Sequence, residues 1–479
     1  MLFNSLEFAI FFPIVGAMYF ILPQRLRTLH LLTSSCIFYM AFIPAYILIL
    51  ALTIAIDYCA GLYLEKTVGR ARLWLLVASV TATCLVLFIF KYFYFFTDNV
   101  IGLAGLFGWQ LSGPSIHIIL PIGLSFHTFQ SLSYVIEVYR GRQKAEPNFV
   151  TYATYVMFFP QLVAGPIERP QNLLHQFYER HEFDYVRVTS GLKRMAWGFF
   201  KKLVIADRLA LYVNDVYAVP QNANGLQLTL ATIFFAYEIY CDFSGYSDIA
   251  IGSARVLGFR LMENFDRPYC SPTISEFWRR WHISLSTWFR DYIYIPLGGS
   301  KFGERRHFAS LLVTFTVSGL WHGANWTYVC WGLLNAVYLI VGSLSKDVRN
   351  RIFGSIGMKE ATWTRRSVMW GSTFLLTCIG WVLFRAKTMT DAKYILTHFA
   401  TDWDFGNIGT EQFLMRQMAI AVAGIALLET VQLLQNWGSP SAFVARLPVM
   451  ARWTVYASAI IAMIMFGIFR QTQFIYFQF

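Results

Sequence analysis

The sequence predicts an all-α, polytopic integral membrane protein, and three observations support this fold class. The 479 residues are 56% hydrophobic and only 14% charged, whereas soluble domains carry about 25% charged residues. Apolar runs of about 20 residues, long enough to cross a bilayer as a helix, recur along the chain. The net charge of +12 suits loops beside anionic lipid rather than nucleic-acid binding. We expect about 10 to 12 spanning helices plus re-entrant or interfacial helices around a central tunnel.

The candidate spans begin near the first residue. Residues 6–22 have no basic segment before them and no small-residue cleavage site after them, so we expect a retained span. The remaining apolar runs cover residues 29–50, 51–64, 73–96, 116–138, 226–240, 311–319, 326–344, 368–384, 418–434 and 453–469. Several of these runs are short or are interrupted by Gly and Pro.

The middle of the chain differs from both ends. Residues 141–310 contain long stretches too polar to face lipid, and such backbone survives at membrane depth only where protein covers it or water reaches it. Residues 158–166, with Pro160 and Pro166, suit a re-entrant turn. We therefore expect one membrane domain over 1–479, divided into N-terminal spans (1–140), a core with re-entrant segments (141–345) and C-terminal spans (346–479).

A basic, aromatic-rich segment lies within this core. Residues 191–209 read as a helix in the membrane interface. Two interpretations are open: a surface helix whose long cationic side chains extend to the water, or a patch that binds a phosphorylated ligand. The basic residues are Lys193, Arg194, Lys201, Lys202 and Arg208.

Two histidines forty residues apart are the strongest candidates for chemistry. His282 and His322 lie among Trp, Arg, Gly and Ser, where a neutral imidazole could accept a proton from an alcohol near pH 7. Gly319 and Gly323 on either side of His322 allow another backbone or a ligand to approach closely. Ionisable side chains in membrane segments are costly and usually functional. The alternative is that each is a hydrogen-bonded histidine inside a helix bundle.

The surroundings of His282 predict a polar pocket. If residues 275–290 form one helix, then Trp278, His282, Ser286 and Phe289 share a face. The arginines around that stripe are Arg279, Arg280 and Arg290.

Other polar residues are weaker candidates. Glu238, Asp242 and Asp248 could orient an imidazole or pair with the arginines, and a structural ion pair is the favoured reading. His127 either lines a pocket or packs in the core. The nine histidines and seven cysteines show no metal-site spacing, so we expect no metal.

The motifs around the two histidines resemble the membrane-bound O-acyltransferase family, most closely its bacterial branch typified by the membrane subunit of alginate O-acetylation. The resemblance rests on residues 277–286 (FWRRWHISLS) and 319–323 (GLWHG). Supporting stretches are residues 120–127, 163–169, 240–248, 294–299 and 474–479.

The resemblance implies a fold and a reaction. It implies tilted spans around a tunnel that crosses the membrane, with His322 as the catalytic base and His282 as the second catalytic position. His282 would orient His322 or polarise a thioester carbonyl. Residues expected to line the tunnel or hold substrate are Trp278, Trp281, Ser286, Trp321, Asn325, His127, Asp242, Arg279 and Arg280.

The resemblance also implies substrates and partners. No cofactor would be bound permanently, and acetyl-CoA would be the acyl donor. The acetyl group would pass, at the bacterial inner membrane, to a periplasmic hydrolase-like acetyltransferase that modifies an exopolysaccharide of the alginate or cellulose type. Membrane lipid would surround the spans. Teichoic-acid D-alanyl transfer and peptidoglycan O-acetylation are enzymatic alternatives, and a transporter for an acyl group or lipid-linked sugar is an alternative of another class.

Overall fold

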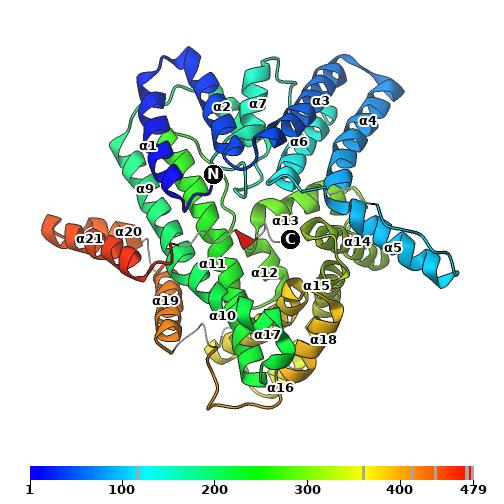
Figure 1. Ribbon diagram of the computed structural model, residues 1–479, viewed down its shortest axis with the longest axis vertical. Helices are drawn as coiled ribbons and strands as arrows, with labels where there is room; N and C mark the ends of the chain where they lie inside the picture. Colours follow the sequence, from blue (N-terminus) through cyan, green and yellow to red (C-terminus); the bar gives the residue numbers. More distant parts are fainter. Residues whose placement is uncertain (115–117, 359–361, 411–414, 436–439, 470–473, 476–479) are drawn as a thin grey trace. The chain divides into compact units, whose positions relative to one another are not determined.

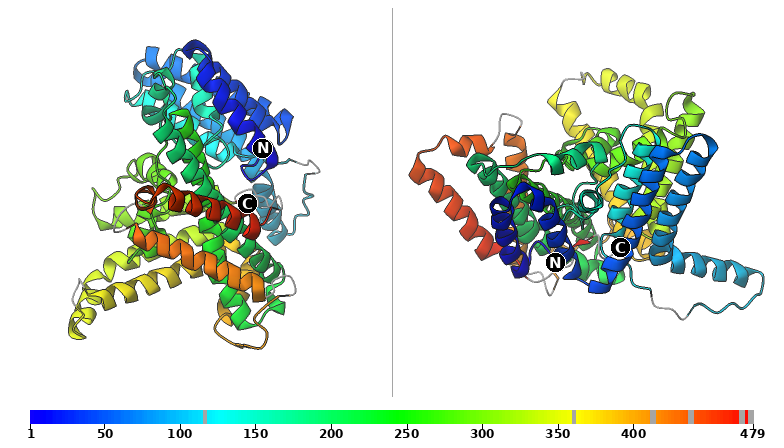
Figure 2. Two further views of the ribbon diagram at one scale, coloured as in Figure 1. Left: turned by 90° about the vertical axis from the view of Figure 1, so that its left-hand side faces the viewer. Right: turned by 90° about the horizontal axis from the view of Figure 1, so that it is seen from above.

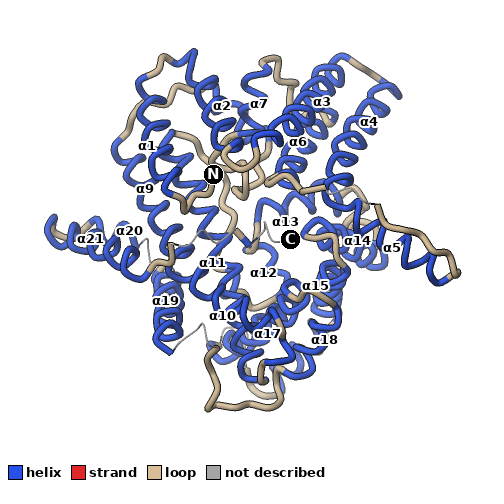
Figure 3. The backbone as a smooth tube through the Cα atoms, in the orientation of Figure 1, coloured by secondary structure: helices blue, strands red, loops and turns tan. Residues whose placement is uncertain are grey.

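The computed structural model of the protein consists of helices and loops (Figure 3). It describes residues 1–114, 118–358, 362–410, 415–435, 440–469 and 474–475, and these contain no β-strand. The expected all-α class is therefore confirmed. The chain forms two compact units, one of residues 1–195 and 247–263 and the other of residues 196–246 and 264–478. The threefold division expected from the sequence stays a prediction.

The first unit is built mainly from the N-terminal helices. Helix α3 packs against α4 and α6, and α2 packs against α7 (Figures 1 and 2). Asp57 of α3 accepts hydrogen bonds from Ser79 and Thr83 of α4, so a buried carboxylate joins these two apolar helices. The helices are α1 (Leu6–Ile21), α2 (Gln24–Met40), α3 (Ile47–Lys66), α4 (Gly69–Leu87), α5 (Phe93–Leu106), α6 (Leu124–Tyr139), α7 (Phe149–Met157), α8 (Pro170–Leu173) and the first part of α9 (Tyr185–Phe199).

The second unit holds both candidate histidines. Helix α14 packs along α15, and α15 packs against α17. The long helix α11 (Gly225–Leu257) runs through both units. The other helices are α10 (Asp207–Ala218), α12 (Ile274–Arg280), α13 (Ile283–Phe289), α14 (Glu304–His322), α15 (Trp326–Leu344), α16 (Lys346–Ser355), α17 (Trp363–Arg385), α18 (Met389–His398), α19 (Met415–Leu434), α20 (Pro440–Ala445) and α21 (Val449–Phe466).

Six helical segments in the described residues are long and apolar enough to cross a membrane, which agrees with a multi-pass membrane protein. They are Pro44–Lys66, Gly69–Leu106, Trp326–Leu344, Trp363–Arg385, Met415–Leu434 and Val449–Phe466. Leu6–Ile21 is apolar but shorter. The larger number of crossings expected from the sequence stays a prediction.

Two expected spans have different boundaries in the structure. The run 29–50 is broken, because α2 ends at Met40 and Pro44 opens a short 3₁₀ turn before α3. The run 116–138 becomes a helix only from Leu124, and its first two residues lie outside the described part.

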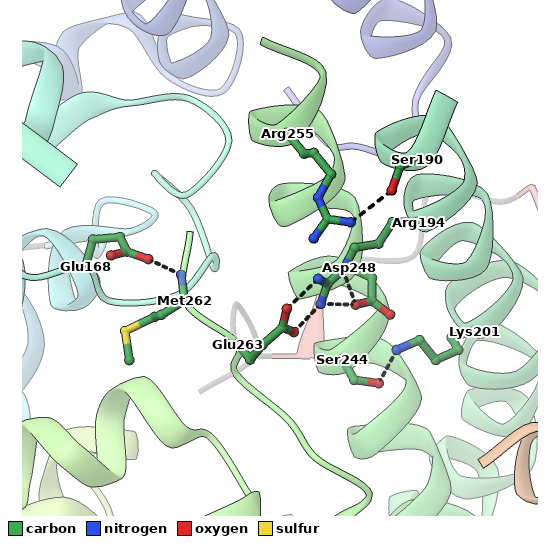
Figure 4. A network of polar contacts seen from close by, with 9 residues as sticks. All are labelled: Glu168, Ser190, Arg194, Lys201, Ser244, Asp248, Arg255, Met262 and Glu263. Atoms are coloured by element: carbon green, nitrogen blue, oxygen red, sulfur yellow. Dashed lines mark hydrogen bonds and ion pairs between the residues drawn. The ribbon is translucent and has the colours of Figure 1, made fainter. Parts of the chain in front are cut away.

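The irregular segment 158–166 is buried throughout, as expected for non-helical backbone covered by protein. It follows α7 directly and belongs to the first unit. Just beyond it, the buried carboxylate of Glu168 accepts a hydrogen bond from the backbone N–H of Met262 (Figure 4). Whether this segment is re-entrant stays a prediction.

The basic segment 191–209 is exposed near its start, at Lys193, and buried from residue 201 onward. It continues from α9 through a π-helical turn, Phe200–Ala206, into α10. Lys201, Lys202 and Arg208 are buried, so the interpretation as long cationic side chains reaching water is wrong for these three. Buried charges need partners, and Lys201 donates to Ser244 (Figure 4).

Arg194, in the first unit, is also held by acidic partners. It pairs with Asp248 at 2.9 Å and with Glu263 (Figure 4). The ion pair with Arg194 explains how the Asp248 carboxylate is stabilised near an apolar run.

Candidate functional site

His282 lies at a sharp break between two short helices. Helix α12 ends at Arg280, Trp281 is extended, and His282 has φ 43° and ψ 56° before α13 begins. This left-handed conformation costs a non-glycine residue about 1–2 kcal/mol. The prediction of one helix over 275–290 is therefore wrong, and Trp278, His282 and Ser286 do not share a helix face.

The loop 264–266 replaces the helical hydrogen bonds lost at this break. The backbone N–H of Ile283 donates to the carbonyl oxygen of Asn264 at 2.9 Å. The N–H of Asp266 donates to the carbonyl oxygen of Arg280 at 3.0 Å. These two bonds, one on each side of His282, offset the cost of the left-handed residue.

The ring of His282 is buried and has polar and aromatic neighbours. Its Nδ1 lies 3.0 Å from Oδ1 of Asn264, and its ring contacts Phe243 edge-on at a centroid distance of 4.5 Å. The residue is 1% exposed. Burial lowers the pKa of His282 to about 3, because desolvation disfavours the imidazolium. His282 is therefore a neutral imidazole near pH 7.

His322 ends helix α14 and lies where two helix backbones nearly touch. A Cβ on Gly319 would lie 2.2 Å from the carbonyl oxygen of Tyr328, and one on Gly323 would lie 2.1 Å from the Tyr328 ring. The glycines beside His322 therefore allow another backbone to approach, as the sequence suggested. This approach places the end of α14 against the start of α15.

Aromatic rings enclose His322. Trp331 of α15 lies 5.0 Å from the imidazole and Phe384 of α17 lies 5.2 Å away, both edge-on. The preceding Trp321 contacts the rings of both His322 (4.8 Å) and His282 (6.4 Å). One indole thus contacts both candidate imidazoles, and all three side chains are buried.

The other uncharged residues predicted to line the tunnel differ in burial and in their hydrogen-bond partners. Trp281 is buried and stacks on Phe277, whereas the indole N–H of Trp278 donates to Asn335. Ser286 donates to the carbonyl oxygen of Trp281 at 3.1 Å. Asn325 accepts from the N–H of Thr327 and so caps α15. Ser286 and Asn325 therefore have evident structural roles.

Of the charged residues predicted to line the tunnel, one is exposed and two form ion pairs. Arg279 is exposed, whereas Arg280 pairs with Glu276 within α12. Asp242 pairs with Lys202 at 2.6 Å and accepts from the N–H of Ile475. The predicted ion pair of Asp242 is therefore present, but its cation is Lys202 rather than an arginine.

His127 belongs to the first unit. It lies in α6 and is buried, and its Nε2 has no hydrogen-bond partner within the described ranges. Its role as a tunnel residue stays a prediction. Of the predicted tail motif 474–479, only residues 474 and 475 lie within the described part of the chain. Phe474 contacts Phe243 and Tyr246.

Sequence reasoning missed several residues around the histidines. Asn264 lies in a loop without a recognisable spacing relative to His282, and only the three-dimensional pairing reveals it. Trp331 and Phe384 were treated as ordinary residues of apolar runs, although both contact His322. A tryptophan within a span, such as Trp331, is the one signal that could have been followed.

The arrangement suits proton transfer in a site shielded from water. A buried, neutral imidazole can accept a proton from a hydroxyl, and surrounding rings hinder hydrolysis of a reactive acyl group. Each histidine buries a polar ring at a break or end of a helix. The catalytic role of the two histidines stays a prediction.

Comparison with known proteins identifies the family. Residues 140–385 match the model of the membrane-bound O-acyltransferase family. The chain is 37% identical to a probable alginate O-acetylase of Azotobacter vinelandii, over 92% of this chain and 86% of the relative. It is 32% identical to a peptidoglycan O-acetyltransferase of Helicobacter pylori, over 83% and 79%.

A more distant relative is a teichoic acid D-alanyltransferase of Streptococcus thermophilus, 28% identical over 51% of this chain and 63% of that protein. The matched family region includes both His282 and His322. The chain is therefore an O-acyltransferase rather than a transporter, and it belongs to the membrane-bound O-acyltransferase family.

Proposed function

We propose that the protein takes an acetyl group from cytoplasmic acetyl-CoA and passes it across the bacterial inner membrane for O-acetylation of an exopolysaccharide. The observation that carries this proposal is the similarity, over 92% of the chain, to a protein named as a probable alginate O-acetylase. The polymer is of the alginate or cellulose type. A periplasmic, hydrolase-like acetyltransferase receives the acetyl group and modifies the polymer.

His322 is the proposed base. It takes the proton of the acceptor hydroxyl while the oxygen attacks the thioester carbonyl carbon, which gives a tetrahedral oxyanion. The oxyanion collapses, the C–S bond breaks, and His322 returns its proton to the leaving thiolate of CoA. The products are an acetyl ester and free CoA. The position of His322 at the end of α14, among buried rings, supports this role.

The aromatic enclosure has a separate role in the proposal. Trp281, Trp321 and Trp331 are each less than 5% exposed. A thioester beside such rings is shielded from bulk water, so transfer to the acceptor competes favourably with hydrolysis. Exposed Arg279 is available for the phosphates of CoA, whereas Arg280 is engaged with Glu276.

Peptidoglycan O-acetylation is the second candidate function. The relative with that name covers 83% of the chain at 32% identity, so the same donor chemistry with another polymer is consistent with the similarity. D-alanyl transfer is less supported, because its relative matches only 51% of this chain.

The test uses the full-length protein in proteoliposomes with acetyl-labelled acetyl-CoA, and the periplasmic partner and polymer on the opposite side. Wild-type protein should transfer label to the polymer, and His322→Ala should not. His398→Ala is the matched control, because His398 is an exposed residue of α18. Wild-type transfer by His322→Ala, or transfer only from a D-alanyl carrier, would overturn the proposal.

A further inference from the structure

We infer that Asn264 is a positioning residue that keeps the ring proton of His282 on Nδ1 and thereby makes Nε2 the basic nitrogen. The inference deepens the proposed function and rests on it, because it assigns one of two roles to His282. It starts from the side-chain oxygen of Asn264, which lies 3.0 Å from Nδ1 of His282.

The orientation of the Asn264 amide follows from a second contact. The backbone N–H of Ser284 points to Oδ1 of Asn264 at 3.3 Å, and the Ser284 hydroxyl donates to the same oxygen at 2.9 Å. A backbone N–H is only a donor, so the Asn264 atom that it faces must be the oxygen rather than the NH₂ group. A flipped amide would place two donors against each other.

The proton position on His282 follows from this orientation. A carbonyl oxygen only accepts, so Nδ1 of His282 must carry the proton that it shares with Asn264. In a neutral imidazole one nitrogen donates and the other accepts, and Nε2 is then the acceptor. Such control of one ring nitrogen by the hydrogen bond of the other is the usual way proteins choose a histidine tautomer.

Asn264 also fixes the direction of the ring through the backbone. Its carbonyl oxygen accepts from Ile283, directly after the left-handed His282. Both Asn264 and His282 are 1% exposed, so water does not compete for these bonds. One asparagine thus holds the side chain of His282 and the backbone N–H of the next residue, Ile283.

This tautomer selects between the two roles considered for His282. A neutral ring with its proton on Nδ1 cannot donate from Nε2, so it does not polarise the thioester carbonyl. It can accept a hydrogen bond from an N–H or O–H of the reacting groups. His282 therefore supports proton transfer by His322 rather than oxyanion stabilisation.

The first test measures the tautomer without any activity. Protein containing carbon-13 and nitrogen-15 histidine is reconstituted in lipid, and solid-state NMR spectra are compared with those of His282→Gln to identify the His282 signals. The expected ring is neutral with the proton on Nδ1. A ring with the proton on Nε2, or a charged ring, would overturn the inference.

The second test compares two substitutions of Asn264. Asn264→Asp keeps an acceptor oxygen, whereas Asn264→Leu keeps the approximate volume and removes it. Loss of the partner that orients a metal-bound histidine costs about 10- to 100-fold. We expect a fall of the same order in kcat for Asn264→Leu, with little change in KM for acetyl-CoA. Asn264→Asp should retain about tenfold more activity than Asn264→Leu, because the orienting oxygen remains.

Gln432→Leu is the matched control, since it removes another buried amide, from α19, that bonds Tyr240. Equal kcat values for Asn264→Asp and Asn264→Leu, or an unchanged kcat in Asn264→Leu, would contradict the inference. If Asn264→Leu does not fold, the NMR result for the wild-type protein decides. If polymer acetylation survives His322→Ala, the proposed function fails while the NMR result on the tautomer stands.

Discussion

The two candidate histidines are held in different ways, although both are buried in the same unit. His282 lies in a left-handed break and its ring bonds to Asn264. His322 ends a helix, and Trp331 and Phe384 enclose its ring. A polar partner fixes where a proton lies, whereas an aromatic enclosure fixes position and excludes water. This difference fits the unequal tasks that we propose, in which His322 exchanges the proton of the reaction and His282 supports it.

The largest expected effect is at His322. His322→Ala removes the proposed base, and general base catalysis contributes about 10²–10⁴-fold to rate. We expect a fall of that size in labelled acetyl transfer by purified, reconstituted protein. His307→Ala is a second control, since His307 lies in the first part of the same helix α14, far from its C-terminal end, and bonds Tyr294. An equal loss of acetyl transfer in His322→Ala and His307→Ala would argue against a specific role of His322 as the base.

A smaller loss is expected at His282. His282→Leu removes the proposed acceptor but leaves the base, so kcat should fall by about 10- to 100-fold, as for other supporting partners. The measurement is the same transfer assay with acetyl-CoA varied to separate kcat from KM. If His282→Leu costs more than His322→Ala, the two assignments should be exchanged.

The aromatic enclosure gives a prediction about side reactions. Trp331→Ala opens the ring packing around His322, so water should gain access to the thioester. We expect the ratio of acetyl-CoA hydrolysis to acetyl transfer to rise. Each 1.4 kcal/mol by which the barrier to hydrolysis falls relative to the barrier to transfer raises this ratio about tenfold. Trp363→Ala, at an exposed residue that begins α17, should leave the ratio unchanged. A ratio that is also unchanged in Trp331→Ala would argue against water exclusion by this ring.

The close approach of α14 and α15 gives a prediction about stability. Gly319→Ala places a Cβ 2.2 Å from the carbonyl oxygen of Tyr328, and overpacking of this kind costs about 1–3 kcal/mol. Gly342→Ala, in α15, meets nothing within 4 Å and should be neutral or slightly stabilising. Thermal unfolding in detergent compares the two. A Tm for Gly319→Ala at or above that of Gly342→Ala would contradict the close contact between the two helix backbones.

The smallest effect is expected at Asn325. It caps α15 through Thr327, and loss of such a cap costs about 1 kcal/mol. Asn325→Ala should therefore lower Tm slightly, and by more than Asn325→Asp, which keeps the capping oxygen but loses the hydrogen bond that the amide donates to the carbonyl oxygen of Lys387. A large fall in kcat of a stable Asn325→Asp protein would instead restore Asn325 as a tunnel residue.

The sequence was sufficient for the fold class and the family, but not for the geometry around the two candidate histidines. Long apolar runs determine spanning helices almost alone, so residues 326–344 coincide with α15. Residues 275–290 have helical periodicity, yet the helix breaks at His282, where hydrogen bonds to the loop 264–266 replace the helical ones. Such long-range bonds have no local signature. The burial of Lys202 likewise has no local signature, because it depends on ion pairs with Asp207 and Asp242.

The most direct test of two unequal histidines in one reaction is a double-mutant cycle in the labelled acetyl-transfer assay. Residues that act as a unit give losses that do not multiply. We expect that His322→Ala combined with His282→Leu is no slower, within about threefold, than His322→Ala alone. A double variant whose loss equals the product of the two single losses would show that the two histidines act independently, contrary to the proposed mechanism.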